Sequence, residues 1–108
     1  MGDISKAPKI HQTRTLTAAA TLEPVDSGVI FLNNSGTFTV TLPPAAVSAG
    51  VWFQFVKTSA AAAAVTLDGN ASETINGSTT FASIDAQYDA ATIVCNGTAW
   101  FIADSKIA

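Results

Sequence analysis

Apolar and polar residues alternate with a period of two along most of this sequence. In the segment TFTVTL, residues 37–42, three apolar side chains alternate with threonine, which is typical of a half-buried β-strand. In VWFQFVK, residues 51–57, both faces of the expected strand are largely apolar, so we expect a strand that is central or that faces a partner chain. Short apolar runs at 28–32 and 65–67, each bounded by turn residues, predict two further strands.

The clearest element is a hairpin in the last third of the chain. The apolar runs 92–95 and 98–103 flank Asn96-Gly97, a dipeptide that strongly favours a hairpin with a type I′ turn. Both central residues of that turn need a positive φ, which Asn and Gly adopt readily. The alternation puts Trp100 and Ile102 on one face of the second strand and Phe101 on the other.

Turn-forming clusters recur about every ten residues, which indicates a sandwich or small barrel. We expect an all-β fold, an antiparallel, jelly-roll-like β-sandwich over residues 15–108, preceded by an extended N-terminal arm over residues 1–14. The Pro-Pro-Ala-Ala run at 43–46 predicts a crossover between sheets. The serine and five alanines at 59–64 predict a connection whose small side chains let segments approach closely. The residues expected to be buried are Val29, Phe31, Phe38, Val40, Leu42, Phe53, Phe55, Ile93 and Trp100.

The composition points to a surface that other chains cover. Hydrophobic residues make up 48% of the sequence and charged residues only 12%, about half of the share usual in soluble proteins. The net charge of -3 and the pI near 4.7 argue against binding to nucleic acid. No apolar run reaches the ~18 residues of a membrane span, and no signal peptide begins the sequence, so we expect synthesis in a cytoplasm and no membrane partner.

Residues suited to catalysis are scarce. The single histidine, His11, lies in the arm, and the single cysteine, Cys95, alternates within a strand, where a buried hydrophobic role is expected. Asp85 and Asp89 flank Tyr88 at the entrance to a strand, where turn and surface roles explain them. No zinc-ligand spacing and no phosphate-binding loop is present. We therefore expect no catalytic, cofactor-binding or metal-binding residues and no enzymatic activity.

Four phrases of the sequence resemble a known module. The runs TFTVTLPPAAVSAGVWFQFV, VTLDG, ETINGS and ATIVCNGTAWFIA together resemble a β module of tailed-bacteriophage virion proteins, over roughly residues 15–104. The module is found at the ends of tail fibre and tailspike chains and in small head decoration, or cement, proteins. Because it fills nearly the whole chain, we expect a compact knob rather than a fibre.

The resemblance implies a function and partners. A decoration protein binds the outer surface of the phage head, bridges capsomers and stabilises the capsid, often as a homotrimer. The major capsid protein and further copies of this chain would then be the partners, and the capsid surface the location. The alternative that remains open is a receptor- or carbohydrate-binding module of a tail fibre, tailspike or head fibre.

Two groups of residues are the candidates for these contacts. The basic arm suggests a tether to an acidic surface, here the capsid, through Ile4, Lys6, Lys9, Ile10 and Arg14. The low charge and the two-sided apolar strands suggest an oligomer interface, for which the candidates are Trp52, Gln54, Val56 and Phe101.

Overall fold

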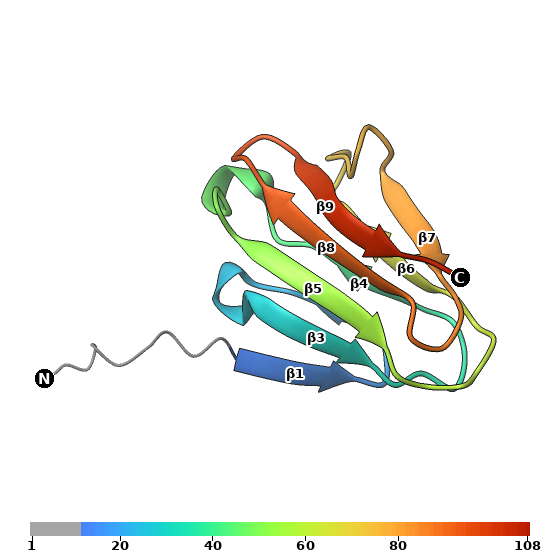
Figure 1. Ribbon diagram of the computed structural model, residues 1–108. Coiled ribbons are helices and arrows are strands. Elements are labelled where there is room, and N and C mark those ends of the chain that lie inside the picture. The colour runs from blue at the N-terminus through green and yellow to red at the C-terminus, as the bar shows by residue number, and fades with distance from the viewer. Residues whose placement is uncertain (1–11) are drawn as a thin grey trace, which may run out of the picture.

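The protein is described by a computed structural model that covers residues 12–108 (Figure 1). This part of the chain forms nine strands and two short 3-10 helices. In chain order they are β1 (Gln12–Leu16), β2 (Ala20–Thr21), η1 (Pro24–Asp26), β3 (Gly28–Leu32), β4 (Phe38–Thr41), η2 (Ala45–Val47), β5 (Trp52–Lys57), β6 (Val65–Asp68), β7 (Thr80–Ile84), β8 (Ala90–Cys95) and β9 (Trp100–Lys106).

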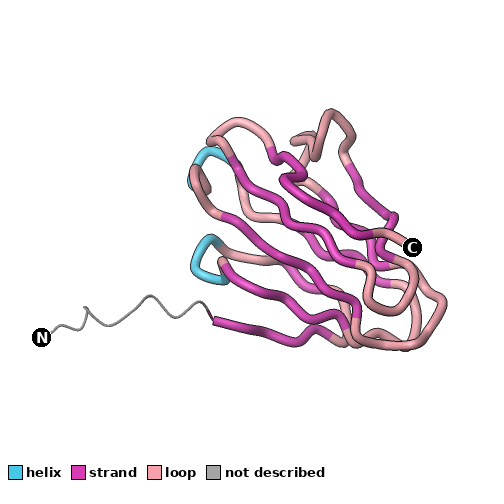
Figure 2. The backbone as a smooth tube through the Cα atoms, in the orientation of Figure 1, coloured by secondary structure: helices cyan, strands magenta, loops and turns pink. Residues whose placement is uncertain are grey.

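The strands form two sheets, and the first six strands alternate between them. One sheet has five strands in the order β1-β3-β5-β8-β9, and the other has four in the order β2-β4-β6-β7. From β1 to β6, each strand pairs in parallel with the strand two places before or after it. The chain therefore winds in successive turns, and each turn contributes one strand to each of the two sheets (Figure 2).

The last three strands run antiparallel to the strands that they pair with. β7 pairs with β6, β8 with β5 and β9 with β8, all antiparallel. The all-β expectation is confirmed, but the antiparallel pairing expected throughout is wrong for β1 to β6, and the jelly-roll-like connectivity is not confirmed. The physical reason is that alternation identifies a strand without fixing its direction. Long connections, such as residues 42–51 with η2, carry the chain across to the other sheet instead of turning it back in a hairpin.

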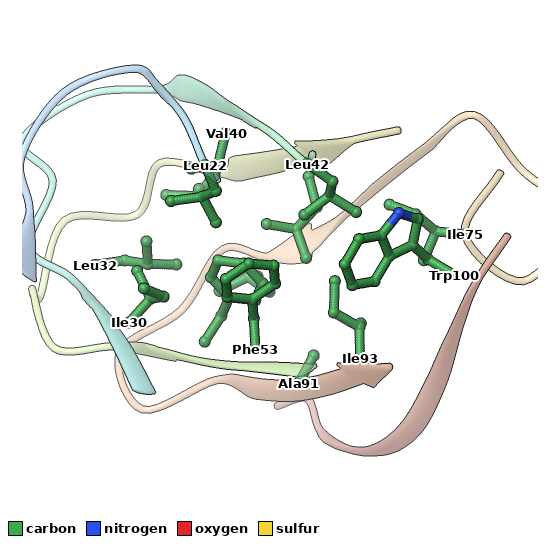
Figure 3. Packing of buried hydrophobic residues seen from close by; sticks show 14 of the residues in the cluster. Leu22, Ile30, Leu32, Val40, Leu42, Phe53, Ile75, Ala91, Ile93 and Trp100 are labelled. Atoms are coloured by element: carbon green, nitrogen blue, oxygen red, sulfur yellow. The ribbon is translucent and has the colours of Figure 1, made fainter. Parts of the chain in front are cut away.

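The core lies between the two facing sheets (Figure 3). Trp100 stacks on Phe53 with ring centroids 5.7 Å apart, and Phe53 lies 5.9 Å from Phe55. Of the residues expected to be buried, six are buried and Phe38 is partly buried; the six are Val40, Leu42, Phe53, Phe55, Ile93 and Trp100.

The expectation for Val29 and Phe31 is wrong. Both are only partly buried, because β3 turns Ile30 and Leu32 into the core instead. Every residue of GVIFL that follows the glycine is apolar, so the pattern alone did not show which face of the strand points inward.

The two Asn-Gly dipeptides form different turns. The hairpin between β8 and β9 is confirmed, but its type I′ turn is wrong: only Gly97 has a positive φ, and the Asn96 side chain accepts hydrogen bonds from the N–H groups of residues 98 and 99. At Asn76 and Gly77 both φ angles are positive, 50° and 86°, as a type I′ turn requires. There residues 75 and 78 exchange both backbone hydrogen bonds.

The elongated body has two ends that differ in the segments they present. The end at which β1 begins, here called the proximal end, carries η1, η2 and the β8–β9 turn at 96–99 (Figure 1). The opposite, distal end carries the loops at 33–37 and 58–64, the turn at 85–89 and the C-terminal Ala108.

Candidate interaction surfaces

The outer face of the five-stranded sheet is rich in apolar side chains. Strand register places three rows of residues across it, and charge occurs only where two of the rows reach β9. The rows are Trp52–Val94–Phe101, Thr13–Val29–Gln54–Thr92–Asp104 and Thr15–Phe31–Val56–Ala90–Lys106. We call these residues the five-strand outer face.

The four residues expected at an oligomer interface all lie on this face. Trp52, Gln54 and Val56 alternate along β5 away from the core, and Phe101 stands next to Val94, which is opposite Trp52. Phe101 is 43% exposed, and Trp52 and Val56 are partly buried. The structure thus brings the four candidates together, while their role at an interface stays a prediction.

The outer face of the four-stranded sheet has a different character. Its central strands β4 and β6 present Thr39, Thr41, Thr66 and Asp68 outward, while Val40, Val65 and Leu67 point into the core. Threonine and aspartate suit contact with water. The two faces therefore differ in how well each tolerates exposure, and the five-strand outer face is the one that gains from being covered.

A shallow hollow of about 220 Å³ lies on the five-strand outer face near the distal end of β8 and β9. The register of β8 and β9 shifts between Thr92 and Ile93, so that β9 carries an extra residue beside the hollow. Gln54 donates a hydrogen bond to the hydroxyl of Thr92 at 3.2 Å within it. The lining residues are Gln54, Ala90, Ala91, Thr92, Asp104, Ser105 and Lys106.

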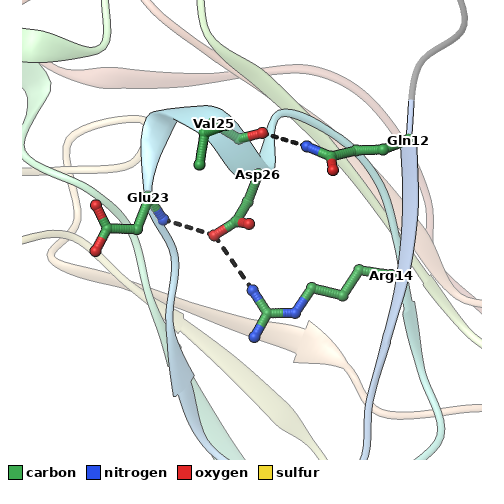
Figure 4. A network of polar contacts seen from close by, with 5 residues as sticks. All are labelled: Gln12, Arg14, Glu23, Val25 and Asp26. Carbon is green, nitrogen blue, oxygen red and sulfur yellow. Dashed lines mark hydrogen bonds and ion pairs between the residues drawn. The ribbon is translucent and has the colours of Figure 1, made fainter.

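The start of β1 is tied to η1 by polar contacts (Figure 4). The Gln12 side chain donates a hydrogen bond to the carbonyl oxygen of Val25, and the Arg14 guanidinium forms an ion pair with Asp26 at 3.2 Å. Asp26 also accepts a hydrogen bond from the Glu23 N–H at 2.9 Å. These contacts fix the position of η1 relative to the point at which β1 begins.

This geometry bears on the residues expected in the arm. Arg14 lies inside β1, and its side chain already pairs with Asp26, so the expected boundary after residue 14 falls within a strand. The other arm candidates, Ile4, Lys6, Lys9 and Ile10, lie outside the described residues, as does His11. A contact of any of the five candidates with a capsid stays a prediction.

At the distal end two charged side chains, those of Lys57 and Asp89, are buried, although neither was expected to be. The Lys57 ammonium donates to the carbonyl oxygen and hydroxyl of Ser59 at 3.0 and 2.8 Å, and to the carbonyl oxygen of Ala61. Ser59 in turn donates to the Asn34 side chain, whose amide group donates to the carbonyl oxygens of Gly36 and Ala63. The network orders two distal loops. A lysine that ends an apolar strand before a serine and a run of alanines was the available signal.

The second buried charge is the Asp89 carboxylate, which holds the turn at 85–89 and the C-terminus. It accepts hydrogen bonds from the N–H groups of Asp85, Ala86 and Ala108 at 3.1, 2.9 and 2.8 Å. Burial raises the pKa of Asp89, but these hydrogen bonds lower it by more than burial raises it, so the pKa lies below its ordinary value. The expected turn role is confirmed, and the expected surface position is wrong.

The remaining chemistry of the described residues is sparse. Cys95 is buried, as expected, and its sulfur accepts a hydrogen bond from the Gly97 N–H. Among residues 12–108, no group of three His, Cys, Asp or Glu side chains is placed to hold a metal ion. No helix in that part of the chain has the length and apolar character needed to cross a membrane.

No family model matches the chain, and no curated protein matches it significantly.

Proposed function

We propose that this chain is a decoration protein of a tailed-phage capsid, which binds the outer surface of the head and bridges capsomers. The observation that carries the proposal is the five-strand outer face, on which Phe31, Val56, Val94 and Phe101 gather with charge confined to β9. A small domain gains by covering such a face with another protein chain. The resemblance of residues 15–104 to phage virion modules supports a phage particle as the assembly that the chain joins.

In this proposal the protein is a homotrimer whose subunits meet through the five-strand outer face. The Thr-rich outer face of the other sheet then remains in contact with water. The body is a β-sandwich of two facing sheets, and the antiparallel, jelly-roll-like connectivity is not carried over, because β1 to β6 pair in parallel. The N-terminal segment that precedes β1 supplies further contacts to the shell.

A second function is favoured by one observation. The hollow carries the amide group of Gln54 together with hydroxyl and charged groups, which are contributed by Thr92, Asp104, Ser105 and Lys106. Such groups suit a polar ligand, so a receptor- or carbohydrate-binding module of a tail or head fibre is the alternative. The two functions differ in the number of copies on a particle.

Binding to phage heads that lack the protein tests the proposal. We expect hundreds of copies per head, counted by quantitative mass spectrometry of purified particles, and a trimeric mass in solution by light scattering. A few copies confined to tails would favour the alternative. No binding to heads would contradict the decoration role. Removal of residues 2–11, which stops before Gln12 and its bond to η1, should leave the body folded and weaken binding.

Phe101→Asp isolates the interface from the fold. The charge enters the proposed interface from a side chain that is 43% exposed in the described subunit. We expect the mass to fall to that of a monomer with the circular dichroism spectrum unchanged. Thr66→Asp, on the outer face of the other sheet, is the matched control and should remain a trimer. A trimeric Phe101→Asp variant would show that the subunits meet elsewhere.

A further inference from the structure

The dipeptide Asn-Gly, which occurs twice in this chain, has a chemistry of its own. The backbone nitrogen of the glycine can attack the Cγ atom of the asparagine side chain, and the absence of a glycine side chain leaves the approach open. Both dipeptides lie in turns, at 76–77 and at 96–97, and both asparagines are exposed. The two turns surround the reacting atoms differently, so the two sites should differ in reactivity.

The glycine nitrogens have different partners. Attack requires the glycine N–H to lose its proton to a base in solution, which is easier where the N–H faces water. The Gly97 N–H donates a hydrogen bond to the sulfur of Cys95 at 3.3 Å, and Gly97 is partly buried. Gly77 is exposed, and its N–H has no hydrogen-bond partner among residues 12–108. The Gly77 nitrogen is therefore the more accessible nucleophile.

The space beside the two glycines differs in the same sense. A methyl carbon placed on the Cα atom of Gly97 would lie 3.4 Å from the Cβ atom of Ala49. The same position at Gly77 has no atom within 4 Å, apart from its neighbours in the chain. The peptide group at Gly77 thus has more room to rotate as the ring closes.

The asparagine side chains are held by different numbers of hydrogen bonds. The Asn96 Oδ1 atom accepts two, from the N–H groups of Thr98 and Ala99 at 2.9 and 3.0 Å. The Asn76 Oδ1 atom accepts one, from the Ile102 N–H at 2.9 Å. Fewer bonds have to break before the Asn76 amide carbon can turn toward the glycine nitrogen.

We infer that Asn76 is a site of spontaneous deamidation in the folded protein and that Asn96 is protected. The Gly77 nitrogen gives up its proton to a base in solution and forms a bond to Cγ of Asn76. The C–N bond of the side-chain amide breaks, and its nitrogen takes up a proton and leaves as ammonia. Water then opens the cyclic imide at either carbonyl, which leaves aspartate or isoaspartate at position 76. No oxidant or reductant takes part.

The modification changes the surface and the turn. It adds one negative charge to a chain whose net charge is -3. Isoaspartate also lengthens the backbone by one methylene group inside a tight turn, in which residues 75 and 78 exchange both backbone hydrogen bonds. Asn76 bonds to Trp100 and Ile102 of the edge strand β9, so isoaspartate should loosen the segment that lies along the start of this strand.

Peptide mass spectrometry after incubation at mildly alkaline pH tests the inference on the protein alone, without phage heads. Each site is followed by the small gain in mass when its amide is exchanged for a carboxylate. In the folded protein we expect Asn76 to react at least tenfold faster than Asn96. The matched control is the same protein in concentrated urea, where the fold no longer protects either dipeptide and the two rates should agree within about twofold.

Three outcomes would overturn the inference. Equal rates in the folded protein, or a faster reaction at Asn96, would show that the contacts of the 96–99 turn do not protect it. Reaction at both sites in urea and at neither in the folded protein would show that the turn at Asn76 is protective as well. If the difference persists in urea, the residues that flank each dipeptide cause it and the fold does not.

Discussion

The two ends of the molecule are ordered by different means. At the distal end, the buried Lys57 ammonium and the buried Asp89 carboxylate bind backbone atoms of three segments. At the proximal end, the start of β1 is tied to η1 by the Arg14–Asp26 pair and the Gln12 side chain, whose groups are exposed or partly exposed. Buried charges that lose their partners are costly, whereas exposed ion pairs contribute about 0–1 kcal/mol.

This difference separates stability from binding. The distal loops depend on interactions that solvent cannot replace, so changes there should lower the free energy of unfolding. The proximal turns expose apolar side chains that contribute little to the subunit itself, so changes there should alter association instead. Substitutions at matched positions of the two ends can therefore break or sharpen the comparison.

The largest effect is expected from Lys57→Met. Methionine keeps most of the apolar stem but leaves the oxygens of Ser59 and Ala61, which are partly buried, without their donor. A fully buried acceptor without a partner costs about 1–3 kcal/mol and a partly buried one less, and the loss is partly offset because no ammonium has to be desolvated. We expect a net loss of about 2–3 kcal/mol in the free energy of unfolding, measured by urea denaturation.

Lys106→Met is the control for this substitution, because Lys106 is exposed on β9. Its effect should stay within about 0.5 kcal/mol, as is usual at surface positions. Equal stability of the two variants would show that the Lys57 network does not hold the distal loops.

Asp89→Asn should have a smaller, pH-dependent effect. The lowered pKa of Asp89 means that its ionised form is favoured in the folded state, so its contribution is present above the unfolded pKa of about 3.9 and is lost as the pH falls through the folded value. An asparagine amide group cannot accept a hydrogen bond through its nitrogen. We expect a loss of about 1–2 kcal/mol at pH 7 that shrinks steadily in urea denaturations below pH 4.

The exposed Asp104 provides the control for that substitution. Asp104→Asn, at an exposed position of β9, should change the free energy of unfolding at pH 7 by no more than about 0.5 kcal/mol. If the free energies of unfolding of Asp89→Asn and the unchanged protein differ by the same amount at every pH, the charge of the Asp89 carboxylate is not the cause of the difference.

Local pattern was enough to predict the strands and much of the core. The alternation in β5 correctly put Phe53 and Phe55 inside and Trp52, Gln54 and Val56 outside. Alternation does not encode strand direction, so the parallel winding of β1 to β6 was missed.

The distal network was missed for a related reason. Lysine is rarely buried, and only the fold brings the carbonyl oxygens of residues 59 and 61 around the Lys57 ammonium. The turn at Asn96-Gly97 shows the same limit on a smaller scale. The dipeptide marks a turn, but it does not fix the turn type. The Asn96 side chain accepts hydrogen bonds from two N–H groups of the loop 96–99, and Asn96 lacks the positive φ that Asn76 has.

The smallest effect is expected where the distal end stores backbone strain. Tyr88 has a φ of 71°, in the left-handed region that bulky residues rarely adopt, and the bonds of the Asp89 carboxylate to residues 85 and 86 hold it there. Its side chain is exposed, so Tyr88→Gly should remove the strain at little cost in packing. We expect a gain of about 0.5–1 kcal/mol in the free energy of unfolding, once the greater freedom of glycine in the unfolded chain is subtracted.

Val25→Gly at the proximal end is the matched substitution with the opposite expected sign. Val25 has a negative φ within η1 and a similarly exposed side chain, so glycine relieves no strain there and only adds entropy to the unfolded state. Thermal and urea denaturation of both variants should show Tyr88→Gly above the unchanged protein and Val25→Gly below it. If Tyr88→Gly is instead the less stable of the two, the tyrosine ring makes contacts that outweigh the strain, and the distal end is held by more than its buried charges.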